Sequence, residues 1–260
     1  MRTKNPNSQS AMFAPIQGFL LPFRALLTLF RPGIRPFVLV PLLLNILTFG
    51  LLAWIAVSYF DQFMTEYLPA DTWWSFLRPV LWVVFALGYA LAMFYGFTIL
   101  ANLIASPFNG ILAAKAEERL IGQAPAGANL SLAASIIPAI TGELGKILYF
   151  LKWAIPILIL FVISSFIPGL NVLVTALWVG FGFWFLTYEY ADYPMGNYDI
   201  RPSQQLALLR RRRFKSLGFG AGVSTLMLIM GFVAMPAAVV GATLFWVEDL
   251  KTRHQPPASK

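Results

Sequence analysis

The chain alternates between long apolar runs without charged residues and short segments in which Lys, Arg, Asp and Glu gather. Four uncharged runs cover residues 37–60, 79–114, 153–188 and 216–247. A helix that crosses the hydrocarbon core of a membrane needs about 20 residues. The run 37–60 therefore predicts one crossing, whereas each of the other three is too long for one crossing and too short for two with a loop.

The distribution of basic residues favours one topology. Residues 1–36 carry five Lys or Arg and residues 189–215 carry six, whereas residues 61–78 carry only Arg78 beside three acids. Loops on the cytoplasmic side are enriched in Lys and Arg. If every run crossed once, the most basic loop would face outward. The charges therefore predict that both termini and the loops 115–152 and 189–215 are cytoplasmic and that 61–78 is external.

This topology predicts an all-α integral membrane protein with two kinds of helical element. Two long transmembrane helices cover about 37–60 and 79–105. Two re-entrant helix pairs, which enter and leave on the cytoplasmic side, cover about 153–188 and 216–247. The alternative for the last two runs is a pair of long helices kinked at proline.

Each re-entrant run contains a break near its middle. The first break lies at 164–171 and includes Gly169 and Asn171, and the second is the dipeptide Met235-Pro236. A backbone turn at membrane depth must be buried in protein or line a wet cavity. Gly169, Asn171 and Pro236 are therefore candidate lining residues at the starts of half-helices, with a tight turn capped by Asn171 as the structural alternative.

Composition agrees with a membrane location. Hydrophobic residues make up 58% of the chain and charged residues 12%, whereas soluble domains carry about 25% charged residues. We expect one membrane domain over 1–255, with an interfacial helix at 11–31 and a flexible tail at 256–260. The net charge of +8 is explained by basic cytoplasmic loops and does not require nucleic acid as a partner.

Enzyme chemistry finds little support in the sequence. Cysteine is absent and the single histidine, His254, lies in the polar tail. We expect no catalytic residue, no metal site and no cofactor, because HExxH, P-loop and GxGxxG patterns are also missing. The glycines at 218–222 stand in an apolar helix and indicate close helix packing better than phosphate binding.

The segment before the first crossing suits an oxyanion. Gly33 permits a tight turn with exposed N–H groups, and Pro36 fits the first turn of a helix, whose dipole favours anions. Arg31 and Arg35 add charged donors. The structural alternative is a pair of basic residues that flank a transmembrane helix at the inner surface.

Other charged residues have ordinary interpretations. Glu143 and Lys146 share a helical face and are expected to form a surface pair. Glu189 and Asp192 stand among tyrosines at a membrane boundary, where we expect them to pair with nearby arginines, with a proton-linked role as the functional alternative. The basic run 210–215 is expected to anchor the chain at the inner leaflet, with a collar for anions as its functional alternative.

The sequence resembles the CysZ family of sulfate transporters in bacterial inner membranes. The similar stretches extend from about residue 15 to His254 and comprise 31–35 with 37–45, 106–110 with 112–113, 190–194 with Asn197, 219–221, 235–239, 241–243 and 246–247. The resemblance implies sulfate uptake into the cytoplasm for sulfate assimilation and cysteine biosynthesis. It also implies two spanning helices, two half-inserted pairs and a homo-oligomer; hexamers occur in the family, and the sequence leaves the number of copies open.

The same resemblance implies a sulfate-binding turn. The family's Gly-Leu-Arg turn corresponds to Gly33, Ile34 and Arg35, and Pro36 replaces the further arginine of the family, for which Arg31 is the candidate substitute. We therefore expect sulfate and membrane lipids as partners. The alternative from a different class is a non-transporting scaffold that organises lipids or other proteins.

Overall fold

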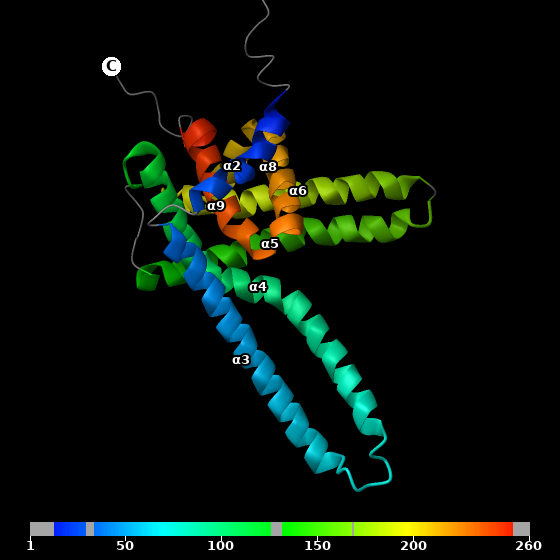
Figure 1. Cartoon of the computed structure of the whole chain (residues 1–260). Coiled ribbons are helices and arrows are strands. Elements are labelled where there is room, and N and C mark those ends of the chain that lie inside the picture. The colour runs from blue at the N-terminus through cyan, green and yellow to red at the C-terminus, as the bar shows by residue number, and fades with distance from the viewer. Residues whose placement is uncertain (1–12, 30–33, 126–131, 168, 252–260) are drawn as a thin grey trace, which may run out of the picture. The chain divides into compact units, whose positions relative to one another are not determined.

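A computed structural model describes residues 13–29, 34–125, 132–167 and 169–251, and these residues form helices and turns without a strand. The predicted all-α class is confirmed for this part of the chain (Figure 1). The elements in chain order are α2 (Ala14–Leu29), α3 (Arg35–Tyr67), α4 (Leu77–Ile121), α5 (Leu132–Ser164), α6 (Leu170–Gly196), α7 (Pro202–Arg211), α8 (Arg213–Met230), the 3₁₀ turn η1 (Gly231–Val233), α9 (Ala234–Phe245) and the π-helical turn η2 (Trp246–Leu250).

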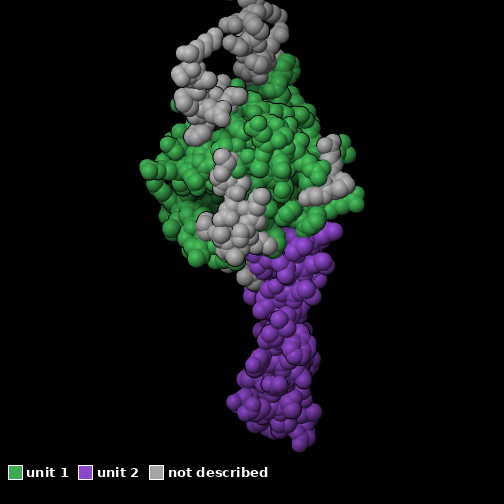
Figure 2. Space-filling model, turned by 90° about the vertical axis from the view of Figure 1, so that its left-hand side faces the viewer, with its two compact units in different colours: residues 1–38, 106–260 green, residues 39–105 purple. Residues whose placement is uncertain are grey.

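The chain divides into two compact units, which Figure 2 colours separately. The smaller unit, residues 39–105, is a hairpin of α3 and the first part of α4. Phe60 of α3 stacks on Phe85 with ring centroids 4.1 Å apart and meets Trp82 edge-on. Most other apolar side chains of α3 are exposed, as in a helix whose solvent is lipid.

Helix α4 runs without interruption through Pro107, which lies inside it. The predicted crossing 79–105 falls within this helix. Its beginning, Leu77–Met93, is apolar, and the side chains of 94–103 are outside the described residues. The crossing itself stays a prediction.

The larger unit is built on close helix contacts at glycines. Gly222 of α8 faces the backbone of Phe19 on α2, and Gly220 faces the backbone of Phe183 on α6. A Cβ atom at either glycine would overlap the neighbouring backbone. The prediction that the glycines at 218–222 serve helix packing is therefore confirmed.

The predicted N-terminal helix is present as α2. Its buried face, which includes Leu21 and Ala25, belongs to the main hydrophobic core together with residues of α8 and α9. The other face exposes Ile16 and Leu27. Such a two-faced helix suits a membrane interface, and that location stays a prediction.

Helices α5 and α6 form a long antiparallel hairpin (Figure 1). Phe150 of α5 lies beside Phe181 and Phe185 of α6, with ring centroids 5.7 and 4.8 Å apart. The turn between the helices includes Gly169 in a left-handed conformation with φ of 84°. The break predicted at 164–171 is confirmed for its described residues, and Pro168 is outside them.

The two helices of this hairpin are longer than a half-penetrating pair requires. Ile140–Ser164 and Leu170–Gly196 are each long and apolar enough to cross a membrane, and so is Arg35–Tyr67 in the smaller unit. The 25 residues of the first segment span roughly 37 Å at 1.5 Å per residue, whereas the hydrocarbon core is about 30 Å thick. The depth of the predicted re-entrant pair stays a prediction.

The second predicted break is displaced toward the N-terminus. The interruption lies at Gly231–Val233, where Gly231 has a positive φ of 52°. Met235 and Pro236 follow it inside the first turn of α9, where a proline does not remove an intrahelical hydrogen bond. Helix α9 is buried along its length and forms part of the core.

Candidate functional site

The predicted sulfate turn lies at the start of α3. Arg31 and Gly33 are outside the described residues. Ile34 is fully buried in the hydrophobic core, and its carbonyl accepts a hydrogen bond of 3.0 Å from the N–H of Phe37. Arg35 is the first residue of α3 and is exposed. Arg35 is thus an exposed residue at the positive end of a helix dipole, beside a residue fixed in the core.

The three predicted lining residues have different surroundings. Gly169 is open to solvent, and nothing lies within 4 Å of the position its Cβ would take. Asn171 is exposed in the first turn of α6, and its carbonyl accepts a hydrogen bond from Thr175 Oγ1 at 2.8 Å. Pro236 is buried in the core. Their role as lining residues stays a prediction.

A buried ionic cluster joins α5 to α6. Lys146 Nζ lies 2.8 Å from Glu143 Oε1, 3.3 Å from Glu189 Oε1 and 3.5 Å from Asp192 Oδ2. The side chain of Lys146 is 2% exposed, and those of Glu143 and Glu189 are each 7% exposed. These four residues are called the Lys146 cluster below.

Neighbouring helices hold the carboxylates of the Lys146 cluster in place. Ser106 Oγ of α4 donates a 2.7 Å hydrogen bond to Glu143 Oε1, and Tyr193 OH of α6 donates another at 3.1 Å. Gln205 Nε2 of α7 donates to Asp192 Oδ1 at 2.9 Å. Charged groups within apolar helices are costly unless they are paired in this way.

The Lys146 cluster has more acids than bases. One lysine and three carboxylates give a formal charge of −2 when all four are ionised. Ionisable residues within apolar helices are rare, and they mark ion pathways or obligatory structural pairs. Three carboxylates already surround Lys146, so the lysine neutralises part of their charge and the cluster as a whole does not favour an anion.

The sequence interpretation of these residues was wrong in two respects. Glu143 and Lys146 are buried instead of forming a surface pair, and Glu189 and Asp192 pair with Lys146 instead of with arginines. The sequence offered one clue. Glu143 and Lys146 stand three residues apart on α5, and Glu189 and Asp192 stand three residues apart on α6. Only the register of the hairpin brings the two pairs together.

A further buried carboxylate, outside the Lys146 cluster, belongs to α4. Glu117 is fully buried, and its Oε1 accepts hydrogen bonds of 2.6 Å from both Tyr198 OH and Lys251 Nζ. Burial raises the pKa of Tyr198, and the hydrogen bond to Glu117 raises it further. Burial lowers the pKa of Lys251, but its contacts with Glu117 and Tyr198 outweigh this effect and raise the pKa above its ordinary value.

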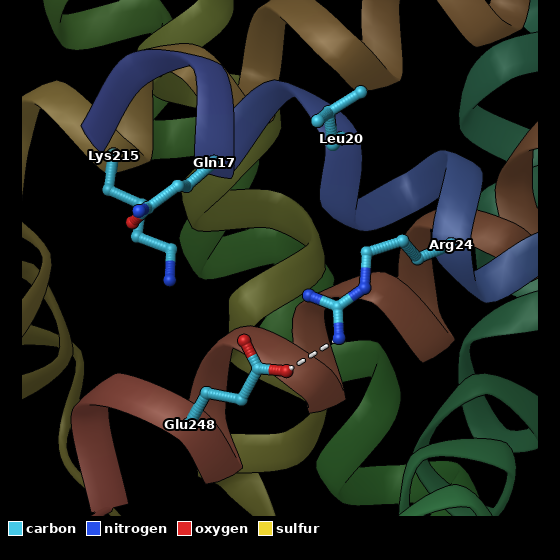
Figure 3. A pocket seen from close by; sticks show the side chains of 5 residues that line it. All are labelled: Gln17, Leu20, Arg24, Lys215 and Glu248. Atoms are coloured by element: carbon cyan, nitrogen blue, oxygen red, sulfur yellow. Dashed lines mark hydrogen bonds and ion pairs between the residues drawn. The ribbon is translucent and has the colours of Figure 1, made fainter. Parts of the chain in front are cut away.

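An acidic pair in η2 holds basic residues of α2 and α8. Glu248 accepts a hydrogen bond from Arg24 at 3.0 Å, and Asp249 pairs with Lys215 and with Arg212. Figure 3 shows Arg24 and Glu248 meeting beside a pocket that Gln17, Leu20 and Lys215 complete. The volume of this pocket is about 360 Å³.

Long apolar helices, two of which bury paired charges between them, define a helical membrane protein. Residues 21–237 match the family described as Sulfate transporter CysZ/Etoposide-induced protein 2.4. Since the match covers most of the sequence, the chain belongs to this family, and the resemblance seen in the sequence is confirmed.

Several relatives extend this finding. A protein of Pseudomonas aeruginosa (strain LESB58) named Sulfate transporter CysZ is 41% identical over 84% of this chain and 89% of its own length. Proteins with the same name from Pseudomonas fluorescens (strain Pf0-1) and Pectobacterium atrosepticum are 41% and 37% identical, each over 84% of this chain and over 88% and 79% of their own lengths.

Proposed function

We propose that this protein carries sulfate across the bacterial inner membrane into the cytoplasm and so supplies sulfate assimilation and cysteine biosynthesis. The observation that carries the proposal is 41% identity over 84% of the chain to relatives named as sulfate transporters. The three apolar helices supply elements able to cross the membrane, and the Lys146 cluster supplies polar groups inside the α5–α6 hairpin. The naming of the relatives as transporters also supports a role other than catalysis.

The proposed topology places both termini in the cytoplasm. Two transmembrane helices cover 37–60 and 79–105, and the pairs 153–188 and 216–247 enter and leave on the cytoplasmic side. Support comes from the six basic residues of 189–215, and from the described interruptions next to Ser165 and Gly231.

The proposed sulfate site is the turn formed by Gly33, Ile34 and Arg35, with Arg31 as a further donor. Support comes from the exposed Arg35 at the first turn of α3 and from the anchoring of Ile34 in the core. Fixed N–H donors and a guanidinium are suited to replace the hydration shell of a dianion.

We further propose that the protein assembles as a homo-oligomer in contact with membrane lipids, with a hexamer as the form that family resemblance implies. Support comes from the apolar exposed faces of α3, α5 and α6. Faces of this kind must be covered by lipid or by another copy of the chain.

Flux of labelled sulfate into proteoliposomes that contain only this protein tests the transport proposal. We expect uptake faster than in empty vesicles, reduced uptake in Arg35→Ala, which changes the proposed sulfate turn, and retention in Arg78→Ala, which removes an arginine elsewhere in the chain. Uptake no faster than in empty vesicles would reject transport and favour the scaffold alternative.

A further inference from the structure

The ends of α7 and α8 form a strongly basic pocket in the larger unit. Arg210, Arg211, Arg212, Arg213, Phe214 and Lys215 line it together with Ala14 of α2. Its volume is about 210 Å³, which accommodates a phosphate group with adjoining headgroup atoms. The pocket brings five basic side chains together at one surface of the unit.

Most of this positive charge is uncompensated. Asp249 pairs with Lys215 and Arg212 and thereby fixes two of the five cations. Within the described part of the chain, Arg210, Arg211 and Arg213 pair with no carboxylate. The guanidinium groups of Arg210 and Arg211, with that of Arg213 over the Phe214 ring, favour an anion with several oxygen acceptors, because Arg binds phosphate oxygens in a bidentate manner.

Apolar side chains adjoin the basic pocket. Phe214 lines it and is 55% exposed, and Phe13 precedes the lining residue Ala14 and is 48% exposed. Ile16 and Leu20 continue the exposed apolar stripe along α2. An anion bound here has a hydrophobic surface beside it, which suits an amphiphile better than a free inorganic ion.

We propose that this pocket binds the phosphate of an anionic phospholipid headgroup, with the acyl chains along the exposed stripe of α2. Arg210 and Arg211 supply the charge, and Asp249 holds Arg212 and Lys215 in position. The site is separate from the proposed sulfate turn at α3. The pocket would thus be a defined lipid-binding site, in addition to the general attraction between basic loops and the inner leaflet.

Binding of fluorescent short-chain phosphatidylglycerol to the detergent-solubilised full chain tests this proposal. The test variant is Arg210→Gln with Arg211→Gln, and the matched control is Arg78→Gln with Lys152→Gln, which removes the same charge elsewhere. Each Arg near an anionic lipid contributes about 1 kcal/mol, so the test variant is expected to lose roughly thirtyfold in affinity. The control is expected to keep its affinity, and Arg210→Lys with Arg211→Lys to keep only part of it, because lysine keeps the charge and loses the bidentate geometry.

The competition arms identify the ligand. We expect unlabelled anionic lipid to displace the bound phosphatidylglycerol, and salt to weaken its binding. Inorganic phosphate and phosphatidylcholine are expected not to displace it. Equal affinity in the test variant, or an equal loss in the control, would overturn the proposal. Complete displacement by inorganic phosphate would overturn it as well, because the site would then bind free anions.

Discussion

Lys146→Met tests the electrostatic role of the Lys146 cluster, because methionine keeps most of the volume and removes the charge together with the hydrogen bonds that Nζ donates to Glu143 and Glu189. The nearest carboxylate oxygen lies 2.8 Å from Nζ, so the direct attraction is about 6 kcal/mol at an effective dielectric constant of 20. Desolvation of the buried groups offsets much of this attraction. When one partner of a buried pair is removed, the net loss of stability is about 3–5 kcal/mol.

We therefore expect Lys146→Met to lower the free energy of unfolding by about 3–5 kcal/mol. Lys152→Met, an exposed lysine on the same helix, should change it by no more than about 0.5 kcal/mol. Chemical unfolding in detergent micelles, followed by circular dichroism, measures both values.

A second variant checks that the loss comes from uncompensated carboxylates. Adding Glu189→Gln to Lys146→Met removes one of the acids that the lysine neutralised, and it should recover part of the lost stability. Equal stabilities of Lys146→Met and Lys152→Met would refute the electrostatic reasoning. A further loss on adding Glu189→Gln would show that packing, not charge, dominates the site.

Three other predictions address the sulfate turn, the glycine contacts and the topology. Arg35→Ala should weaken sulfate binding roughly ten- to a hundredfold in calorimetry, because a hydrogen bond to a charged group contributes about 1.5–3 kcal/mol. Arg78→Ala should bind sulfate normally, and unchanged affinity in Arg35→Ala would place the site elsewhere. Gly220→Ala should lower the free energy of unfolding by about 1–3 kcal/mol, because its Cβ overlaps a neighbouring backbone. Gly88→Ala meets open space and should not destabilise the protein, so equal effects of the two variants would contradict the close contact at Gly220. Cysteine introduced by Ser203→Cys into this cysteine-free chain should resist impermeant thiol reagents in intact spheroplasts and react after permeabilisation, and labelling in intact cells would place 189–215 outside.

Sequence patterns predicted much of the helical organisation. The uncharged run 37–60 lies within α3, and the interruption at 164–171 separates α5 from α6. The glycines at 218–222 serve close packing, as their apolar surroundings indicated. These features are local, since apolar length, turn-forming residues and small side chains act through neighbouring positions along the chain.

The second interruption shows the limit of local reasoning. Proline suggested a break at Met235-Pro236, but a proline in the first turn of a helix is compatible with helical geometry. The chain instead breaks at Gly231, which adopts a positive φ at little cost. The packing of α9 into the core sets where this helix begins.

By itself, the sequence determined that the chain is an all-helical membrane protein of the CysZ family with basic segments between its apolar runs. Only the tertiary structure decided that Glu143, Lys146, Glu189 and Asp192 meet in one buried cluster. The physical reason is that the residue type sets the sign of a charge, whereas the helix that packs against it sets its burial and its partner. The sequence of a segment shows which charged residues it contains, whereas the register of the α5–α6 hairpin decides which of them lie close enough to pair.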